Sequence, residues 1–150
     1  SSYVPAYVDR GYVFAQKHIW EGAWIFFSLA IERDSNQTSD VYFERGYAYQ
    51  MSDALSQALT DYEKSIKLNP DFAGGYLNAG NCCIGLKDYE KAIELYDRAL
   101  VLKPDYGSVY YGRGLANVGL RHTDQACLDF RRASELGSTE ANKAISEYCQ

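Results

Sequence analysis

Apolar residues in the stretch 73–106 recur at steps of three and four, which is the spacing of one face of an α-helix. The first stripe joins small and aromatic side chains: Tyr76, Ala79, Gly80 and Cys83. It stops at residues 85–88, where Asp88 is a residue type that caps helix N-termini. A second stripe follows before Pro104, which cannot continue a helix: Ala92, Ile93, Tyr96, Ala99 and Leu100. The stretch therefore predicts two helices joined by a tight turn.

The same pattern returns along the chain at intervals of about 34 residues, in copies that begin at residues 4, 39, 73 and 107. With positions counted from the start of a copy, position 8 is always glycine and position 20 always alanine: Gly11, Gly46, Gly80, Gly114 and Ala23, Ala58, Ala92, Ala126. Position 24 is always aromatic: Phe27, Tyr62, Tyr96 and Phe130. Small residues let the two helices of a hairpin approach closely, and we expect the aromatic side chains to fill the gaps between them.

This pattern resembles the tetratricopeptide repeat family over about residues 4–140. The resemblance implies an all-α fold, a right-handed α-solenoid of stacked helical hairpins without strands. We expect one domain over residues 1–150, with repeats at about 4–38, 39–72, 73–106 and 107–140. A half-polar stretch at about 138–150 predicts a C-terminal capping helix, because the last core face of a solenoid must be covered. Three copies carry arginine where the family pattern has leucine at position 7, which we expect to weaken individual contacts: Arg10, Arg45 and Arg113.

The composition argues against several classes of function. A net charge of −5 disfavours general nucleic-acid binding, which needs a basic stripe. No apolar run approaches the roughly 20 residues of a membrane-spanning helix, so we expect no membrane insertion. His18 and His122 lie in turns of the first and fourth copies, too far apart to share a metal ion or a proton. We therefore predict a protein that is not an enzyme and holds no metal or cofactor.

The family resemblance also indicates where a partner would bind. It implies that the first helix of each repeat lines a concave groove, with positions 5 and 9 pointing into it and position 6 beside them. These positions are mostly apolar or tyrosine, with amide groups near the centre: Val8, Tyr12, Phe43, Tyr47, Leu77, Asn78, Asn81, Tyr111 and Leu115. We expect a protein-interaction scaffold whose groove binds a peptide through hydrophobic anchors. The alternative is that some of these side chains are partly buried between neighbouring repeats.

A well-known ligand of this groove in the family is the C-terminal carboxylate of chaperones. The resemblance implies lysine and asparagine at positions 5 and 9 of one repeat, asparagine at 6 of the next, then lysine at 2 and arginine at 6. When these five positions are counted from the second repeat, this chain has Phe43, Tyr47, Asn78, Ser108 and Gly112, of which only Asn78 matches. When the positions are counted from the first repeat, none of the five residues matches. Without a cationic pair to hold a carboxylate, we argue against a chaperone-tail adaptor.

The first repeat carries an unusual apolar group on its second helix: Ile25, Phe26 and Leu29. The corresponding residues of the other repeats are mainly polar, Asp61 and Asp129 among them, and we interpret them as an outer surface exposed to solvent. Two explanations for the apolar group stay open. Either a segment that precedes this chain covers it, or it forms a second interface, including one between copies of the chain in a homo-oligomer. A structural, self-associating repeat unit is accordingly the alternative function.

The four cysteines fit no zinc-binding spacing. Cys83 occupies a core position, and we expect it to be a small buried residue beside Cys82. Cys127 lies on the second helix of the last repeat, on the side where the capping helix carrying Cys149 should pack. A disulfide between them is geometrically feasible if the chain lives in an oxidising compartment, such as the periplasm or the cell exterior. Two thiols, and a cytoplasmic location, are the interpretation that we favour.

Overall fold

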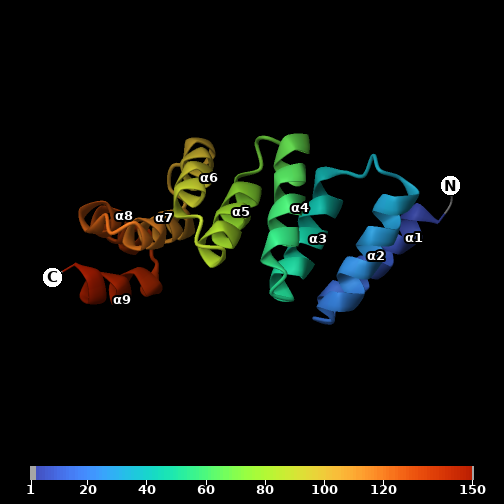
Figure 1. The fold of residues 1–150 in the computed structure, drawn as a ribbon, viewed down its shortest axis with the longest axis horizontal. Helices are drawn as coiled ribbons and strands as arrows, with labels where there is room; N and C mark the ends of the chain where they lie inside the picture. Colours follow the sequence, from blue (N-terminus) through green and yellow to red (C-terminus); the bar gives the residue numbers. More distant parts are fainter. Residues whose placement is uncertain (1–2, 150) are drawn as a thin grey trace. The chain divides into compact units, whose positions relative to one another are not determined.

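The computed structural model describes residues 3–149, and within them it contains nine α-helices and no strand. The helices are α1 (Val4–Gln16), α2 (Trp20–Arg33), α3 (Ser39–Met51), α4 (Leu55–Leu68), α5 (Ala73–Gly85), α6 (Tyr89–Leu102), α7 (Gly107–Gly119), α8 (Thr123–Glu135) and α9 (Thr139–Tyr148). The prediction of an all-α fold, built from four helical hairpins and one further C-terminal helix, is confirmed (Figure 1).

Contacts along the chain divide it into two compact units, Ser1–Pro70 (unit 1) and Asp71–Gln150 (unit 2). In unit 1, α1 pairs with α2, α3 pairs with α4, and α2 lies against α3 (Figure 1). In unit 2, α5 pairs with α6 and α7 with α8, while α7 also contacts both α5 and α6. Helix α9 packs mainly on α8. The prediction of one domain over the whole chain stays a prediction.

Each hairpin is held together by an aromatic ring that packs against a glycine on the facing helix. Phe27, Tyr62, Tyr96 and Phe130 are fully buried. A Cβ atom on Gly80 would lie 2.5 Å from Cε1 of Tyr96, and one on Gly114 would lie 2.5 Å from Cε1 of Phe130. These distances are far below van der Waals contact, so glycine at position 8 is what allows the ring to sit between the helices. The repeated glycine is therefore explained by packing.

The turn inside each repeat contains one residue in the left-handed region, always at position 15. The four residues have φ between 57° and 63°: His18, Asp53, Lys87 and Arg121. Backbone hydrogen bonds typical of a helix C-terminus accompany them; for example, the Asp88 N–H donates to the Cys83 carbonyl oxygen at 2.9 Å. The turn between α8 and α9 has the same bonds but uses Gly137, with φ 93°. In four turns, therefore, a non-glycine residue adopts a backbone conformation that glycine would adopt at lower cost.

Replacing Lys87 with glycine is therefore expected to raise the free energy of unfolding by about 0.5–1 kcal/mol. Relief of a left-handed conformation, worth roughly 1–2 kcal/mol, is partly offset by the greater freedom of glycine in the unfolded chain. Chemical denaturation would measure the change. The matched control is Leu86→Gly, because Leu86 has φ −83° and gains nothing from glycine. Equal destabilisation by both substitutions would show that the turn conformation carries no cost at Lys87.

Candidate functional site: a cavity between α5 and α7

Unit 2 contains a cavity of about 410 Å³ between α5 and α7, here called the α5–α7 cavity. Its walls are mostly apolar, and a few polar groups reach into it: Leu77, Asn81, Ile84, Tyr96, Ser108, Tyr111, Gly112 and Leu115. The structure thus brings together four of the residues that the sequence placed in the groove, namely Leu77, Asn81, Tyr111 and Leu115. Asn78 is half-buried on α5 and is not among the lining residues.

One of the residues that line the cavity is a glycine, Gly112, and it leaves no room for a side chain. A Cβ atom at Gly112 would lie 2.7 Å from both Cζ and Oη of Tyr96, so any larger residue would push against that ring. With glycine there, the ring of Tyr96, which comes from α6 and is fully buried, lies directly beneath the floor of the cavity. The sequence analysis missed both residues. Tyr96 was assigned to the core, and Gly112 was noted only as a residue that stands where the carboxylate clamp has arginine. The combination of glycine at position 6 with the aromatic of the preceding repeat is the signal that could have found them.

One hydrogen bond fixes the polar side of the cavity. Tyr96 Oη donates to Oδ1 of Asn81 at 2.8 Å. Burial raises the pKa of Tyr96 above its usual value, with smaller contributions from Cys83 and Cys82, so the phenol keeps its proton and remains a donor. Because Oδ1 of Asn81 accepts this bond, the amide nitrogen of the exposed Asn81 side chain is the group left to donate to a ligand.

In unit 1 the predicted groove residues lie on α1 and α3 and differ in exposure. Val8 and Tyr12 are half-buried against the core of the unit, as the alternative interpretation allowed, and the Tyr12 ring lies 5.3 Å from that of Phe27. Phe43 is half-buried, with its ring 5.3 Å from that of Tyr62. Tyr47 is 37% exposed and lies edge-on to Trp20 at 5.6 Å. Tyr47 is thus the most accessible of the four.

Helix α3 of unit 1 also presents negative charge beside these rings. Glu44 is half-buried, and its pKa is raised first by burial and then by the nearby Asp40 carboxylate. The pKa of Tyr12 is raised by burial and, to a lesser degree, by Glu44 and Asp40. Carboxylates that already repel one another disfavour an anionic ligand at this surface. The charge is opposite in sign to that of a carboxylate clamp.

Two aspartates that we interpreted as solvent-exposed are buried, so that interpretation is wrong. Asp61 and Asp129 are 3% and 6% exposed. Arg45 donates to Asp61 from Nε at 2.6 Å and from Nη2 at 2.7 Å, and Arg113 donates to Asp129 from the same atoms at 3.0 and 2.7 Å. Such two-pronged pairing is the preferred geometry of arginine with a carboxylate. The arginines at position 7 therefore form specific contacts within their hairpins, contrary to our expectation that they weaken them.

Positions 7 and 23 vary together across the repeats, which is the signal that sequence reasoning overlooked. The second and fourth repeats have arginine with aspartate, and the third has Ala79 with Leu95. In the first repeat, the guanidinium carbon of Arg10 lies 5.7 Å from the ring centre of Phe26, a cation–π arrangement. Each repeat thus has its own matched pair at these positions.

The apolar group on α2 is less exposed than the sequence suggested. Ile25 is 39% exposed, but Phe26 and Leu29 are half-buried. Phe26 stacks on Phe14 of α1 with ring centres 5.2 Å apart, so its own hairpin covers part of it. That a second copy or another segment covers the remaining apolar surface stays a prediction.

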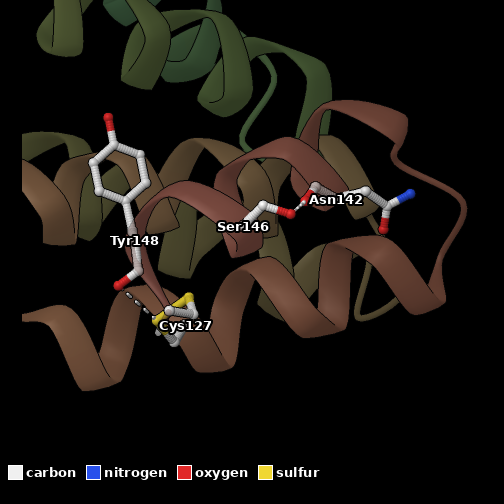
Figure 2. Close-up of a disulfide and its surroundings, with 5 residues drawn as sticks. Cys127, Asn142, Ser146 and Tyr148 are labelled. Atoms are coloured by element: carbon white, nitrogen blue, oxygen red, sulfur yellow. Dashed lines mark hydrogen bonds between the residues drawn. A yellow bond between two sulfur atoms is a disulfide. The ribbon is translucent and has the colours of Figure 1, made fainter.

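Cys127 on α8 and Cys149, which follows α9, form a disulfide with a Cα–Cα distance of 5.7 Å (Figure 2). The structure therefore differs from the pair of thiols that we favoured. Sγ of Cys127 also lies 3.7 Å from the carbonyl oxygen of Tyr148, a contact in which the bonded sulfur has no proton to donate. Cys82 and Cys83 are buried thiols outside the disulfide, and burial, reinforced by Cys83, raises the pKa of Cys82 to about 12.

Among residues 3–149, no group of three or more histidine, cysteine, aspartate or glutamate side chains is arranged to hold a metal ion. Over the same part of the chain, none of the helices combines the length and the apolar character needed to cross a membrane.

Comparison with known proteins identifies the fold family. A sequence profile described as a tetratricopeptide repeat matches residues 39–72, and a second, described as a TPR repeat, matches residues 83–120. The chain belongs to the tetratricopeptide repeat family. This repeat protein is similar to the crystal structure of MamA, at 26% identity and a TM-score of 0.83, covering 94% of this chain and 80% of that one.

Two further relatives of this tetratricopeptide repeat protein concern chaperones. The first TPR domain of Spaghetti (RPAP3), solved bound to the HSP90 peptide SRMEEVD, is 25% identical with a TM-score of 0.73, over 76% of this chain and 92% of that one. Hsp70-Hsp90 organizing protein 3 of Arabidopsis thaliana is 34% identical over 86 residues, which are 57% of this chain and 15% of that protein. The chain thus spans about one seventh of that relative. These matches support a protein-interaction role, and proteins of this family generally act as non-enzymatic scaffolds.

Proposed function

We propose that the chain is a scaffold that binds a peptide segment of a partner protein, with the α5–α7 cavity as the main anchor site. The observation that carries the proposal is the convergence of Leu77, Tyr111 and Leu115 with the Asn81 amide around one cavity. Its volume of about 410 Å³ lies within the roughly 300–1,000 Å³ typical of ligand sites. An apolar cavity with a few placed polar groups suits one large hydrophobic side chain of a peptide.

The polar groups define how the peptide backbone would bind. A hydrophobic side chain enters between Leu77 and Leu115 toward the Tyr96 ring, and a neighbouring peptide carbonyl accepts a hydrogen bond from the amide nitrogen of Asn81. Main-chain bonds of this kind give affinity, while the cavity gives specificity for the side chain. Val8, Tyr12, Phe43 and Tyr47 of unit 1, and Asn78 of unit 2, are proposed as further contacts with the partner.

The proposed peptide differs in charge from the one bound by the RPAP3 domain, SRMEEVD, which has three acidic residues. None of the eight residues lining the α5–α7 cavity is lysine or arginine. In unit 1, Glu44 stands where the clamp pattern has asparagine, and its pKa is raised first by burial and then by the nearby Asp40 carboxylate. A neutral or basic peptide fits these surfaces, and a chaperone tail does not.

The test uses a peptide selected from a random library displayed on phage against the wild-type protein. Leu77→Ala and Tyr47→Ala are expected to weaken its binding by about 1–3 kcal/mol each, the usual loss on truncating an anchoring side chain. Phe43→Ala should act in the same direction. Isothermal titration calorimetry measures affinity, and chemical denaturation verifies that each variant is folded.

The matched control is Val101→Ala on α6, which truncates an apolar side chain that is 71% exposed and lies outside the predicted groove. It should bind the peptide as the wild type does. If Leu77→Ala and Tyr47→Ala stay folded and bind as tightly as Val101→Ala, the proposed site is wrong.

A further inference from the structure

The disulfide fastens the C-terminal end of α9 to α8, where the helix has few other anchors. The first half of α9 is held independently: Ser138 Oγ accepts from the Ala141 amide at 3.2 Å, and Ala141 and Ala144 are buried. The last turn contributes only half-buried side chains, Ile145 and Tyr148. Helices of about ten residues are marginal without tertiary contacts, and unanchored chain ends fray. Figure 2 shows Tyr148 and Cys127 close together at this end.

A short series of aromatic rings connects this end of α9 to the α5–α7 cavity. The ring centre of Tyr148 lies 6.1 Å from that of Phe130, which in turn lies 5.9 Å from that of Tyr111. Phe130 is fully buried, and Tyr111 and Leu115, which line the cavity, pack against the same core cluster. A displacement of Tyr148 therefore removes a neighbour from the side chains that support the cavity wall.

The disulfide is also accessible from outside. Cys127, Cys149, Tyr148 and Arg131 line an open pocket of about 300 Å³ on the surface of α8 and α9. Cys149 is the more exposed of the two cysteines. Thiolates are both the attacking and the leaving groups of disulfide exchange, and the pocket is lined by one basic and one acidic side chain, Arg131 and Asp124, whose effects on a thiolate oppose each other. Cys82 and Cys83, in contrast, are fully buried.

We propose that the Cys127–Cys149 disulfide is a thiol–disulfide exchange site for small dithiols, and that its reduction releases the end of α9 and weakens peptide binding in the α5–α7 cavity. A thiolate of the dithiol attacks Sγ of Cys149, forms a mixed disulfide and expels the Cys127 thiolate. The second thiol of the reagent then displaces Cys149. The dithiol becomes a cyclic disulfide, and two electrons and two protons pass to the protein. The effect on binding rests on the proposed function, but the release of α9 does not.

Hydrogen exchange and methyl NMR test the structural part, with dithiothreitol as the dithiol. Reduction should speed amide exchange at residues 145–149 by about tenfold or more, because an opened terminus loses its protection. Residues of unit 1 should not change. The Leu115 methyl signals should shift, and those of Leu59 in unit 1 should not. Cys149→Ser should reproduce the reduced state without reagent, and Cys82→Ala is the matched control that keeps the disulfide.

Titration of the selected peptide tests the coupling. Affinity should fall by about fivefold or more in the reduced protein and in Cys149→Ser, which is the lower end of usual coupling between sites. Unchanged exchange at residues 145–149 in both would overturn the proposal, and so would equal peptide affinity in the oxidised and reduced proteins. If α9 and Leu115 respond but no peptide binds either state, the proposed function fails while redox control of the cavity wall stands.

Discussion

Replacing Asp129 with alanine is expected to lower the free energy of unfolding by about 2–4 kcal/mol. Asp129 accepts two hydrogen bonds from Arg113 and a third from Nδ2 of Asn117 at 3.3 Å. Removing one partner of a buried ion pair typically costs about 3–5 kcal/mol, because the remaining charge stays desolvated. The Arg113 side chain is 25% exposed and keeps its bond to Asp97, which places the expected value lower. Urea denaturation would measure it.

The chain supplies its own control for this experiment. The third repeat has Ala79 and Leu95 at the positions of Arg113 and Asp129. The double substitution Arg113→Ala with Asp129→Leu copies that pair into the fourth repeat. Replacing both members of a buried ion pair by apolar residues is often close to neutral, so the double variant should recover most of the loss. It should stay about 1–2 kcal/mol below the wild type, because the buried Asn117 amide still loses its acceptor. A double variant as unstable as Asp129→Ala would show that a stranded charge is not the cause of the loss.

Replacing Tyr96 with alanine should lower the free energy of unfolding by about 3–5 kcal/mol, the usual cost of deleting a buried aromatic ring. Tyr96 is fully buried, and Gly80 and Gly112 both lie against its ring, so little of the space can close by a small shift. Tyr96→Phe keeps the ring and removes only the hydrogen bond to Asn81. It should cost about 0.5–1.5 kcal/mol.

Comparison of the two Tyr96 variants separates packing from hydrogen bonding. Chemical denaturation gives the stabilities, and methyl NMR of Leu77 and Leu115 reports on the cavity. We expect Tyr96→Phe to leave those signals nearly unchanged. If it costs as much stability as Tyr96→Ala, the bond to Asn81, and not the ring, holds the hairpin, and the packing explanation of Gly80 is wrong.

The helices were predictable because the same packing requirement recurs at the same positions in all four repeats. Glycine at position 8 and an aromatic residue at position 24 recur in all four copies, and the structure shows the ring against the glycine, as with Gly114 and Phe130. A steric requirement that tight permits few substitutions, so it leaves a clear pattern in a single sequence. The capping helix was visible for a similar reason, since its apolar stripe has helical spacing.

The burial of Asp61 was not predictable from the polarity of its own helix. Its partner, Arg45, lies 16 residues earlier on the facing helix, and only the pair explains why a carboxylate lies in the interior. Burial raises the pKa of Asp61, and the bonds from Arg45 oppose that effect. The α5–α7 cavity was only half predictable: the family geometry selects Leu77 and Leu115, whereas the contribution of Tyr96 depends on the absence of a side chain at Gly112.

Two of the three arginines at position 7, Arg45 and Arg113, also reach beyond their own repeat. Nη1 of Arg45 donates to Oγ of Ser28 at 3.1 Å, and Nη1 of Arg113 donates to Oδ1 of Asp97 at 2.6 Å, in each case on the preceding hairpin. The third repeat has Ala79 at this position, and an alanine side chain has no hydrogen-bond donor. A gene duplication or an engineered shuffle that placed the fourth repeat behind one without an acceptor would leave a donor unmatched at the new junction. The repeats of this chain therefore carry an order, and they are not interchangeable modules.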